Sequence, residues 1–224
     1  MILPALLSIT FRKLPAEEVV RLAAANGIRA IEWGGDIHAP HRDMAALVQV
    51  RDLTRAAGLS VCAYGSYYRI GETDPAKPGF TEVLTAAKVL GAPIIRVWVG
   101  QRGSAEVSVE ERAALVAEAR RIADEAQGEG VIVASEWHGG TITDVEDSAL
   151  DLQLHRGRRV GKAEDVFVQG DHAARLGGLL VQRHLLDVVT DFAKGRKGSE
   201  QLHKLMVHVP GPCREGALDP QGHR

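Results

Sequence analysis

Short apolar runs alternate with helical stretches over the first 150 residues. Pro15 suits a first helical turn, Glu17 and Glu18 favour the helix amino end, and Asn26-Gly27 ends the helix. The run that follows it, Ile28–Trp33, has the length and composition of a strand. The same alternation predicts strands at 3–9, 28–33, 59–64, 93–99 and 130–136, and helices at 15–26, 44–57, 80–90, 108–127 and 143–154.

Five strand–helix units in succession favour a parallel sheet covered by helices. The α/β class is therefore expected, as a (β/α)8-type TIM barrel. A doubly wound open sheet is the alternative, but no Gly-x-Gly-x-x-Gly follows the first strand. Ser108 and Glu111 form a capping box that marks the start of the longest helix.

The pattern becomes irregular after residue 154. Strands at 165–169 and 205–209 and helices within 173–194 and 199–205 can be assigned, but no eighth strand is found. We therefore expect one barrel domain over 1–224, incomplete or irregular after its fifth unit. Within it, 1–150 is regular, 151–209 less so, and 210–224 is a loose tail rich in proline and glycine.

Composition narrows the class of protein. Hydrophobic residues make up 45% and charged residues 25%, which is typical of a globular chain. No apolar run is long enough to span a membrane, and the first residues lack the features of a signal peptide. Cys62 and Cys213 cannot form a disulfide framework, so a reducing, cytoplasmic location is expected.

Net charge gives no case for nucleic acid as a partner. The chain carries −2 overall, and the first 149 residues hold 15 basic and 20 acidic side chains. From residue 150 onward there are 12 basic and 9 acidic ones, so composition changes where the strand–helix pattern fades. We expect neither nucleic acid nor a membrane among the partners.

Polar and aromatic residues follow each of the five predicted strands, where a parallel barrel places its active site. Glu136 ends an apolar strand, and a carboxylate there suits Mn²⁺ or Mg²⁺; the alternative is an ion pair with Arg96 or Arg102. His138 is a candidate proton carrier, and Glu32 a candidate base or ligand of substrate hydroxyls.

Three aromatic residues and one arginine complete the candidate site. Tyr64, Tyr68 and Trp98 would form an apolar wall on which a sugar stacks, unless they fill the barrel core. Arg102 lies in a glycine-rich segment and would meet an anionic group of the substrate, unless it is an ordinary surface arginine.

Five phrases in this order resemble the sugar phosphate isomerase/epimerase family, with its xylose isomerase-like barrel. They lie within the first 150 residues and are Ile31–His38, Tyr64–Tyr68, Ile95–Trp98, Glu136–Thr141 and Thr143-Asp144. The resemblance implies a divalent metal at the barrel mouth, with Glu136 as one ligand. By position it points to Asp171 and His208 as further ligands, although Asp171 also suits a helix N-cap and His208 a core or surface site. The family's fourth ligand, a glutamate, has no match.

The leading hypothesis is a metal-dependent isomerase or epimerase of a small sugar or polyol. The metal would stabilise the enediolate that forms when a carbon loses its proton. A related polyol dehydratase is one alternative. Another is an inactive, self-associating chain, because an unclosed barrel exposes sheet edges. A homodimer is the default assembly, and the low basic charge argues against an abasic-site endonuclease.

Overall fold

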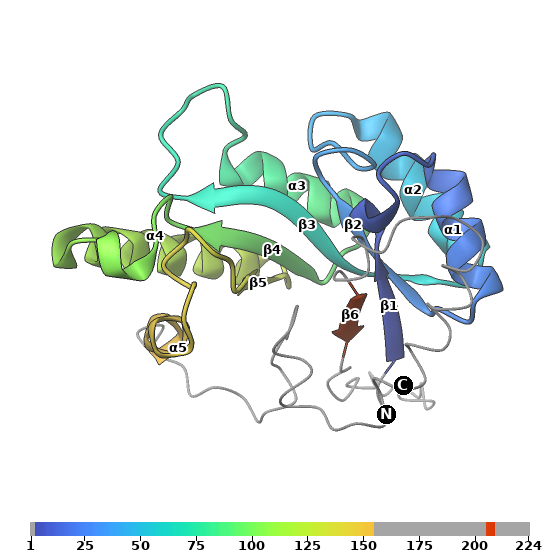
Figure 1. The fold of residues 1–224 in the computed structure, drawn as a ribbon. Coiled ribbons are helices and arrows are strands. Elements are labelled where there is room, and N and C mark those ends of the chain that lie inside the picture. The colour runs from blue at the N-terminus through green and yellow to red at the C-terminus, as the bar shows by residue number, and fades with distance from the viewer. Residues whose placement is uncertain (1–2, 155–204, 209–224) are drawn as a thin grey trace, which may run out of the picture.

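A computed structural model describes residues 3–154 and 205–208 (Figure 1). All five predicted strand–helix units are present in it. The strands are β1 (Leu3–Leu7), β2 (Ala30–Gly34), β3 (Ser60–Ile70), β4 (Ile94–Val99), β5 (Ile132–Ser135) and β6 (Leu205–His208). The helices are α1 (Ala16–Ala25), α2 (Met44–Ala56), α3 (Phe80–Leu90), α4 (Val109–Gly128) and α5 (Glu146–Leu154), with short 3-10 turns at η1 (Ser8–Phe11) and η2 (Ser104–Glu106).

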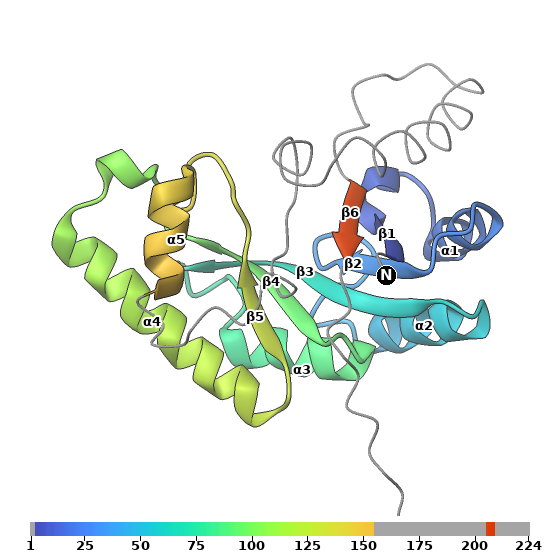
Figure 2. The same ribbon diagram turned by 90° about the horizontal axis from the view of Figure 1, so that it is seen from below.

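The strands form one sheet in the order β5-β4-β3-β2-β1-β6, and β1 to β5 are parallel. Helices α1 to α4 follow one another along the outside of this sheet (Figure 2). Parallel pairing is possible because each helix carries the chain back to the amino end of the next strand. The expected α/β class, with barrel-type strand–helix units, is therefore confirmed for this part of the chain.

Strand β6 differs from the expectation in its direction. A barrel strand at 205–209 would run parallel to β1, whereas β6 runs antiparallel to it, with His208 opposite Leu3. The prediction was wrong on this point because a short apolar run indicates a strand but not the direction in which it pairs. The elements expected at 165–169, 173–194 and 199–205 and the tail at 210–224 fall outside the described residues.

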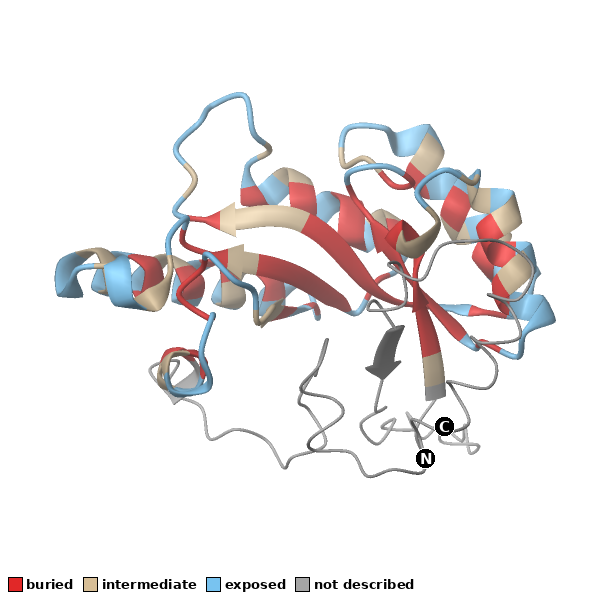
Figure 3. Cartoon of the chain, viewed as in Figure 1, coloured by how far each residue is buried: buried red, intermediate tan, exposed pale blue. Residues whose placement is uncertain are grey.

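The strands are mostly buried, whereas exposed residues lie on the helices and loops (Figure 3). Successive side chains of each strand point to opposite faces of the sheet. The outer face packs against helices α1 to α4 and forms the main core, which includes Ile31, Trp33, Tyr64, Ile95 and Val97. The opposite, inner face holds a second cluster of mostly small side chains: Ala5, Ala30, Cys62, Ala63 and Ile94. Two residues further along β2 and β4, the inner positions are Glu32 and Arg96, so the polar groups gather toward the carboxyl ends.

Side chains cap the starts of two helices, and the sequence predicts the first of these caps. Ser108 caps α4 by accepting a hydrogen bond from the Glu111 backbone N–H at 3.2 Å. Asp43 caps α2 in the same way through the Ala46 N–H at 3.0 Å.

In the part of the chain that the structure describes, no helix is both long and apolar enough to cross a membrane.

Candidate active site at the carboxyl ends of the strands

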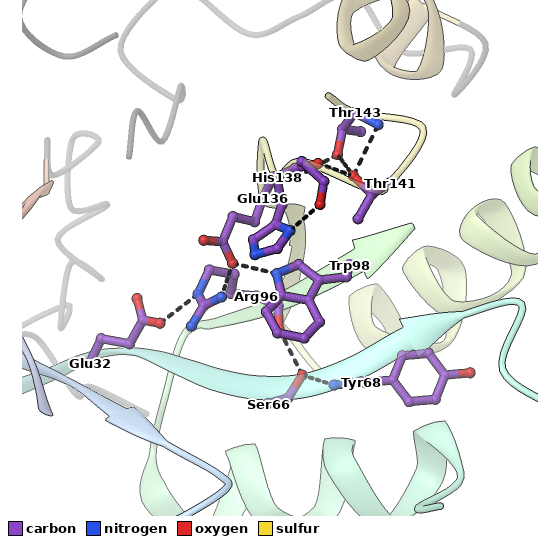
Figure 4. A network of polar contacts seen from close by, with 10 residues as sticks. Glu32, Ser66, Tyr68, Arg96, Trp98, Glu136, His138, Thr141 and Thr143 are labelled. Carbon is purple, nitrogen blue, oxygen red and sulfur yellow. Dashed lines mark hydrogen bonds and ion pairs between the residues drawn. The ribbon is translucent and has the colours of Figure 1, made fainter. Parts of the chain in front are cut away.

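A buried arginine joins two glutamates at the centre of the candidate site (Figure 4). Arg96 Nε donates to Glu32 Oε1 at 2.7 Å, and its Nη1 donates to Glu136 Oε2. The ion pairs connect strands β2 and β4 and the residue that follows β5. In the sequence, Arg96 stands out only as an alternative partner of Glu136. The available sequence signal is that a charged residue, Arg96, interrupts an apolar strand between Ile94 and Trp98.

Glu32 is fully buried beneath Arg96. Its Oε2 has no hydrogen-bond partner among the described residues. Burial raises the pKa of Glu32, and the Arg96 guanidinium opposes that rise. The predicted role of base or ligand of substrate hydroxyls requires contact with substrate, so the geometry better suits a group that supports Arg96 from below.

Gly65 makes room for this pair. A Cβ at residue 65 would lie 2.6 Å from Glu32 Oε1 and 2.7 Å from Arg96 Nη2. The groups that such a Cβ would meet are a carboxylate and a guanidinium that are buried and hydrogen-bonded to each other. Residue 65 is therefore glycine because a side chain would overlap these groups.

Glu136 is oriented by residues of the neighbouring strand β4. Its backbone N–H donates to Val97 O at 3.0 Å, which extends the β4–β5 pairing by one residue. Its Oε2 accepts from both Arg96 and Trp98 Nε1, the latter at 2.6 Å, and no described residue bonds to Oε1. One carboxylate oxygen is thus held in place while the other stays available to a ligand.

Buried threonines hold the segment that follows Glu136. Thr143 Oγ1 donates to Glu136 O at 2.5 Å, and Thr141 Oγ1 donates to His138 O at 2.7 Å. The His138 ring lies beside Trp98, with 4.8 Å between ring centroids. Its Nδ1 lies 2.6 Å from Gly139 O, a carbonyl that can only accept, so Nδ1 is the donor of this hydrogen bond. Nε2 forms no hydrogen bond with a described residue.

A bulge in β3 decides which tyrosine faces the site. Three residues of β3 between Gly65 and Arg69 lie opposite a single residue of β4, Val97. Ser66 Oγ fastens the bulge by donating to Arg96 O at 2.7 Å, and Tyr67 takes the left-handed conformation with φ of 58°. Such backbone strain in a non-glycine residue is typical of functional sites. The Tyr67 ring meets Trp98 edge to face at 5.1 Å.

The predicted wall of Tyr64, Tyr68 and Trp98 is only partly assembled. Trp98 contacts Glu136, but Tyr64 is fully buried in the outer core and donates to Ala39 O at 2.9 Å. The Tyr68 ring lies away from Glu136 (Figure 4) and packs against Phe80 of α3. Tyr67 occupies the place expected for Tyr68, because the sequence cannot show where the bulge turns the chain.

Arg102 was expected to meet an anionic group of the substrate or to be an ordinary surface arginine, and it forms an ion pair on the surface. Its guanidinium pairs with Glu111 at the start of α4, and its side chain is 53% exposed. Arg69 is the last residue but one of β3. Its Cζ atom lies over the Trp98 ring instead, 4.8 Å from the ring centroid. Sequence spacing gives no signal for this, since Arg69 reaches Trp98 only through the pairing of β3 with β4.

The structure describes two of the three proposed metal ligands, Glu136 and His208. Glu136 fits, since its Oε1 is free of bonds to described residues. Asp171 lies outside the described residues, and His208 pairs with Leu3 at the amino end of β1, whereas Glu136 follows the carboxyl end of β5. Within residues 3–154 and 205–208 no three His, Cys, Asp or Glu side chains converge as a metal site would need.

Parallel strand–helix units with a polar cluster at the strand carboxyl ends are typical of a TIM barrel-type scaffold. The chain belongs to the xylose isomerase-like TIM barrel family, whose model matches residues 20–171. This confirms the resemblance read from the sequence. No curated protein matches the chain in sequence.

Solved structures share the fold. The probable 3-DHS dehydratase AsbF of Bacillus anthracis is 24% identical, with a TM-score of 0.61, over 70% of this chain and 60% of that one. D-allulose 3-epimerase from Methylomonas sp. is 19% identical, with a TM-score of 0.54, over 70% and 60%. A xylose isomerase-like protein of Mycobacterium smegmatis, solved with magnesium, is 15% identical with a TM-score of 0.54, over 70% and 62%. The chain thus spans about 60% of the length of these proteins.

Proposed function

We propose that this chain is a divalent-metal-dependent isomerase or epimerase that acts on a small sugar or polyol. The observation that carries the proposal is Glu136, held at the carboxyl end of a parallel strand with one carboxylate oxygen fixed and the other free. Family membership and a D-allulose 3-epimerase among the structural neighbours support it. Mn²⁺ or Mg²⁺ would bind Glu136 together with Asp171, and a bound cation would polarise the substrate oxygens as a Lewis acid.

The residues around Glu136 supply binding and proton transfer. Tyr67 and Trp98 present aromatic surface to the apolar face of a sugar ring. His138 Nε2 would accept a proton from a substrate hydroxyl or carbon and return it during the same turnover. Arg96 holds Glu136 in place, and Glu32 holds Arg96 from below. A cytoplasmic homodimer without nucleic acid or membrane partners completes the proposal.

Metal binding by two matched variants tests this function. Calorimetric titration with MnCl₂ should show binding to the wild type that is lost in Glu136→Gln and retained in Glu111→Gln. Glu111 is the control because it is also paired with an arginine but lies on the exposed surface of α4. At a hundredfold excess over Kd, binding should add about 2.7 kcal/mol to the free energy of unfolding.

Turnover then decides the reaction class. The manganese-loaded wild type should interconvert ketoses and aldoses, or epimeric ketoses, in a panel of small sugars. Loss of water from a cyclic polyol instead would identify a dehydratase. Absence of both metal binding and turnover would overturn the proposal in favour of a non-enzymatic, self-associating chain.

A further inference from the structure

We propose that the substrate of this site carries an anionic group, a phosphate or a carboxylate, and that Arg69 binds it. The inference rests on the proposed function and narrows its substrate class. Arg69 stands opposite Trp98 in the pairing of β3 with β4, so both side chains lie on the inner face. Its guanidinium lies over the indole ring at 4.8 Å, and its Nη1 donates to Gly100 O at 2.6 Å.

Arg69 differs from the other arginines near the strand ends in having no carboxylate partner in the described part of the chain. Arg12 pairs with Asp36, Arg102 with Glu111, and Arg96 with two glutamates. Arg69 is only partly exposed, and among its five N–H donors the described residues engage only Nη1. A cation held by a ring and one carbonyl has donors left for a further ligand.

The position of Arg69 relates it to the reacting groups. The indole that lies under Arg69 donates to Glu136 through Nε1, so one ring separates the arginine from the carboxylate. His138 and Tyr67 contact the same ring at 4.8 and 5.1 Å. A short sugar whose reacting carbons lie at Glu136 and His138 would therefore bring its far end toward Arg69.

The guanidinium selects the chemistry of that far end. Its planar fork matches the paired oxygens of a carboxylate or phosphate, and stacking on Trp98 fixes its orientation beforehand. A neutral hydroxymethyl end would leave these donors with water only. The site thus suits a sugar phosphate or a sugar acid better than a neutral sugar.

Substrate pairs in the manganese-loaded full-length chain test the inference. The wild type should prefer a ketose phosphate or a uronate to the neutral ketose of the same length, and whichever it prefers identifies the anion. Arg69→Met should raise the KM for the anionic substrate about 10- to 100-fold, far beyond any change in the KM for the neutral one. Arg69→Lys should recover part of the loss, and Arg102→Met, the control on an exposed arginine, should change neither.

Inorganic phosphate gives a readout that does not depend on turnover. Phosphate should raise the Tm of the wild type and of Arg102→Met but not of Arg69→Met, whose own melt in plain buffer shows that it folds. If sugars turn over but the KM for the anionic substrate is the same in the wild type and in Arg69→Met, the proposed function stands and the anion site is overturned. If phosphate binds through Arg69 and no sugar turns over, the anion site stands and the proposed function falls.

Discussion

At the scale of single residues, the candidate site depends on the space that Gly65 leaves for two charged side chains. Glu32 and Arg96 are separated by 64 residues in the chain and meet at 2.7 Å next to it. Two buried charges are tolerated because they neutralise each other, and removal of either partner leaves the other uncompensated. The unpartnered Oε2 of Glu32 shows that this compensation is incomplete among the described groups.

We expect Gly65→Ala to lower the free energy of unfolding by about 1–3 kcal/mol, because the added methyl group overlaps Glu32 Oε1 and Arg96 Nη2. Urea denaturation measures the change. Gly128→Ala is the control, since a Cβ there meets nothing within 4 Å and the residue lies in α4, where alanine is favoured. Equal effects of the two substitutions would show that space at Gly65 is not limiting.

At the scale of elements, polar side chains tie loops to strands. His38, in the segment between β2 and α2, is 8% exposed and joins two other segments. Its Nε2 donates to Leu14 O at 3.0 Å, and its Nδ1 then accepts from Ser8 Oγ at 3.1 Å. Ser8 Oγ in turn accepts from the Gly34 N–H at 2.9 Å, so β1, β2 and their loops are joined by one neutral imidazole.

This arrangement predicts a pH dependence of stability. Burial lowers the pKa of His38 below its value of about 6.5 in an unfolded chain. The unfolded state therefore binds protons more readily, and stability should be full above about pH 6.5 and fall as the pH drops. One such group changes the slope by at most about 1.4 kcal/mol per pH unit.

Urea denaturation at several pH values between about 7.5 and 5.5 measures this slope. The slope should become shallower in His38→Gln. His41→Gln should remove a second share, because burial also lowers the pKa of His41. An unchanged slope in both variants would contradict the assignment.

At the scale of the molecule, the two faces of the sheet differ in the size of their side chains and in what they pack against. Large side chains on the outer face hold the helices, and small ones line the inner face below the charged cluster. Cys62 belongs to that inner cluster, and burial raises the pKa of its thiol to about 12. Its reactivity therefore reports whether the sheet stays intact as a whole.

In a Cys213→Ser background, Cys62 should react with a thiol reagent about a thousandfold more slowly in the folded chain than in concentrated urea. The factor follows from a thiol pKa about three units above that of an exposed cysteine, because the thiolate is the reactive form. Absorbance of the released reagent measures the rate. Similar rates in both states would mean that the inner face opens readily.

The sequence predicts five strand–helix units, the Ser108 cap and the placement of Glu136 after a buried strand. These features depend on local patterns: a period of two in strands, a period near 3.6 in helices, and capping residues next to the helix they cap. The predicted xylose isomerase-like barrel family is confirmed by the family match over residues 20–171.

Only the tertiary structure decides which of the named side chains meet. Arg96 joins Glu32 to Glu136 across three strands, Tyr67 replaces Tyr68 at the site because of the bulge, and β6 runs antiparallel to β1. Arg69, not Arg102, lies over Trp98. The physical reason is that strand register, bulges and ion pairs join residues far apart in the chain, where no local period carries information.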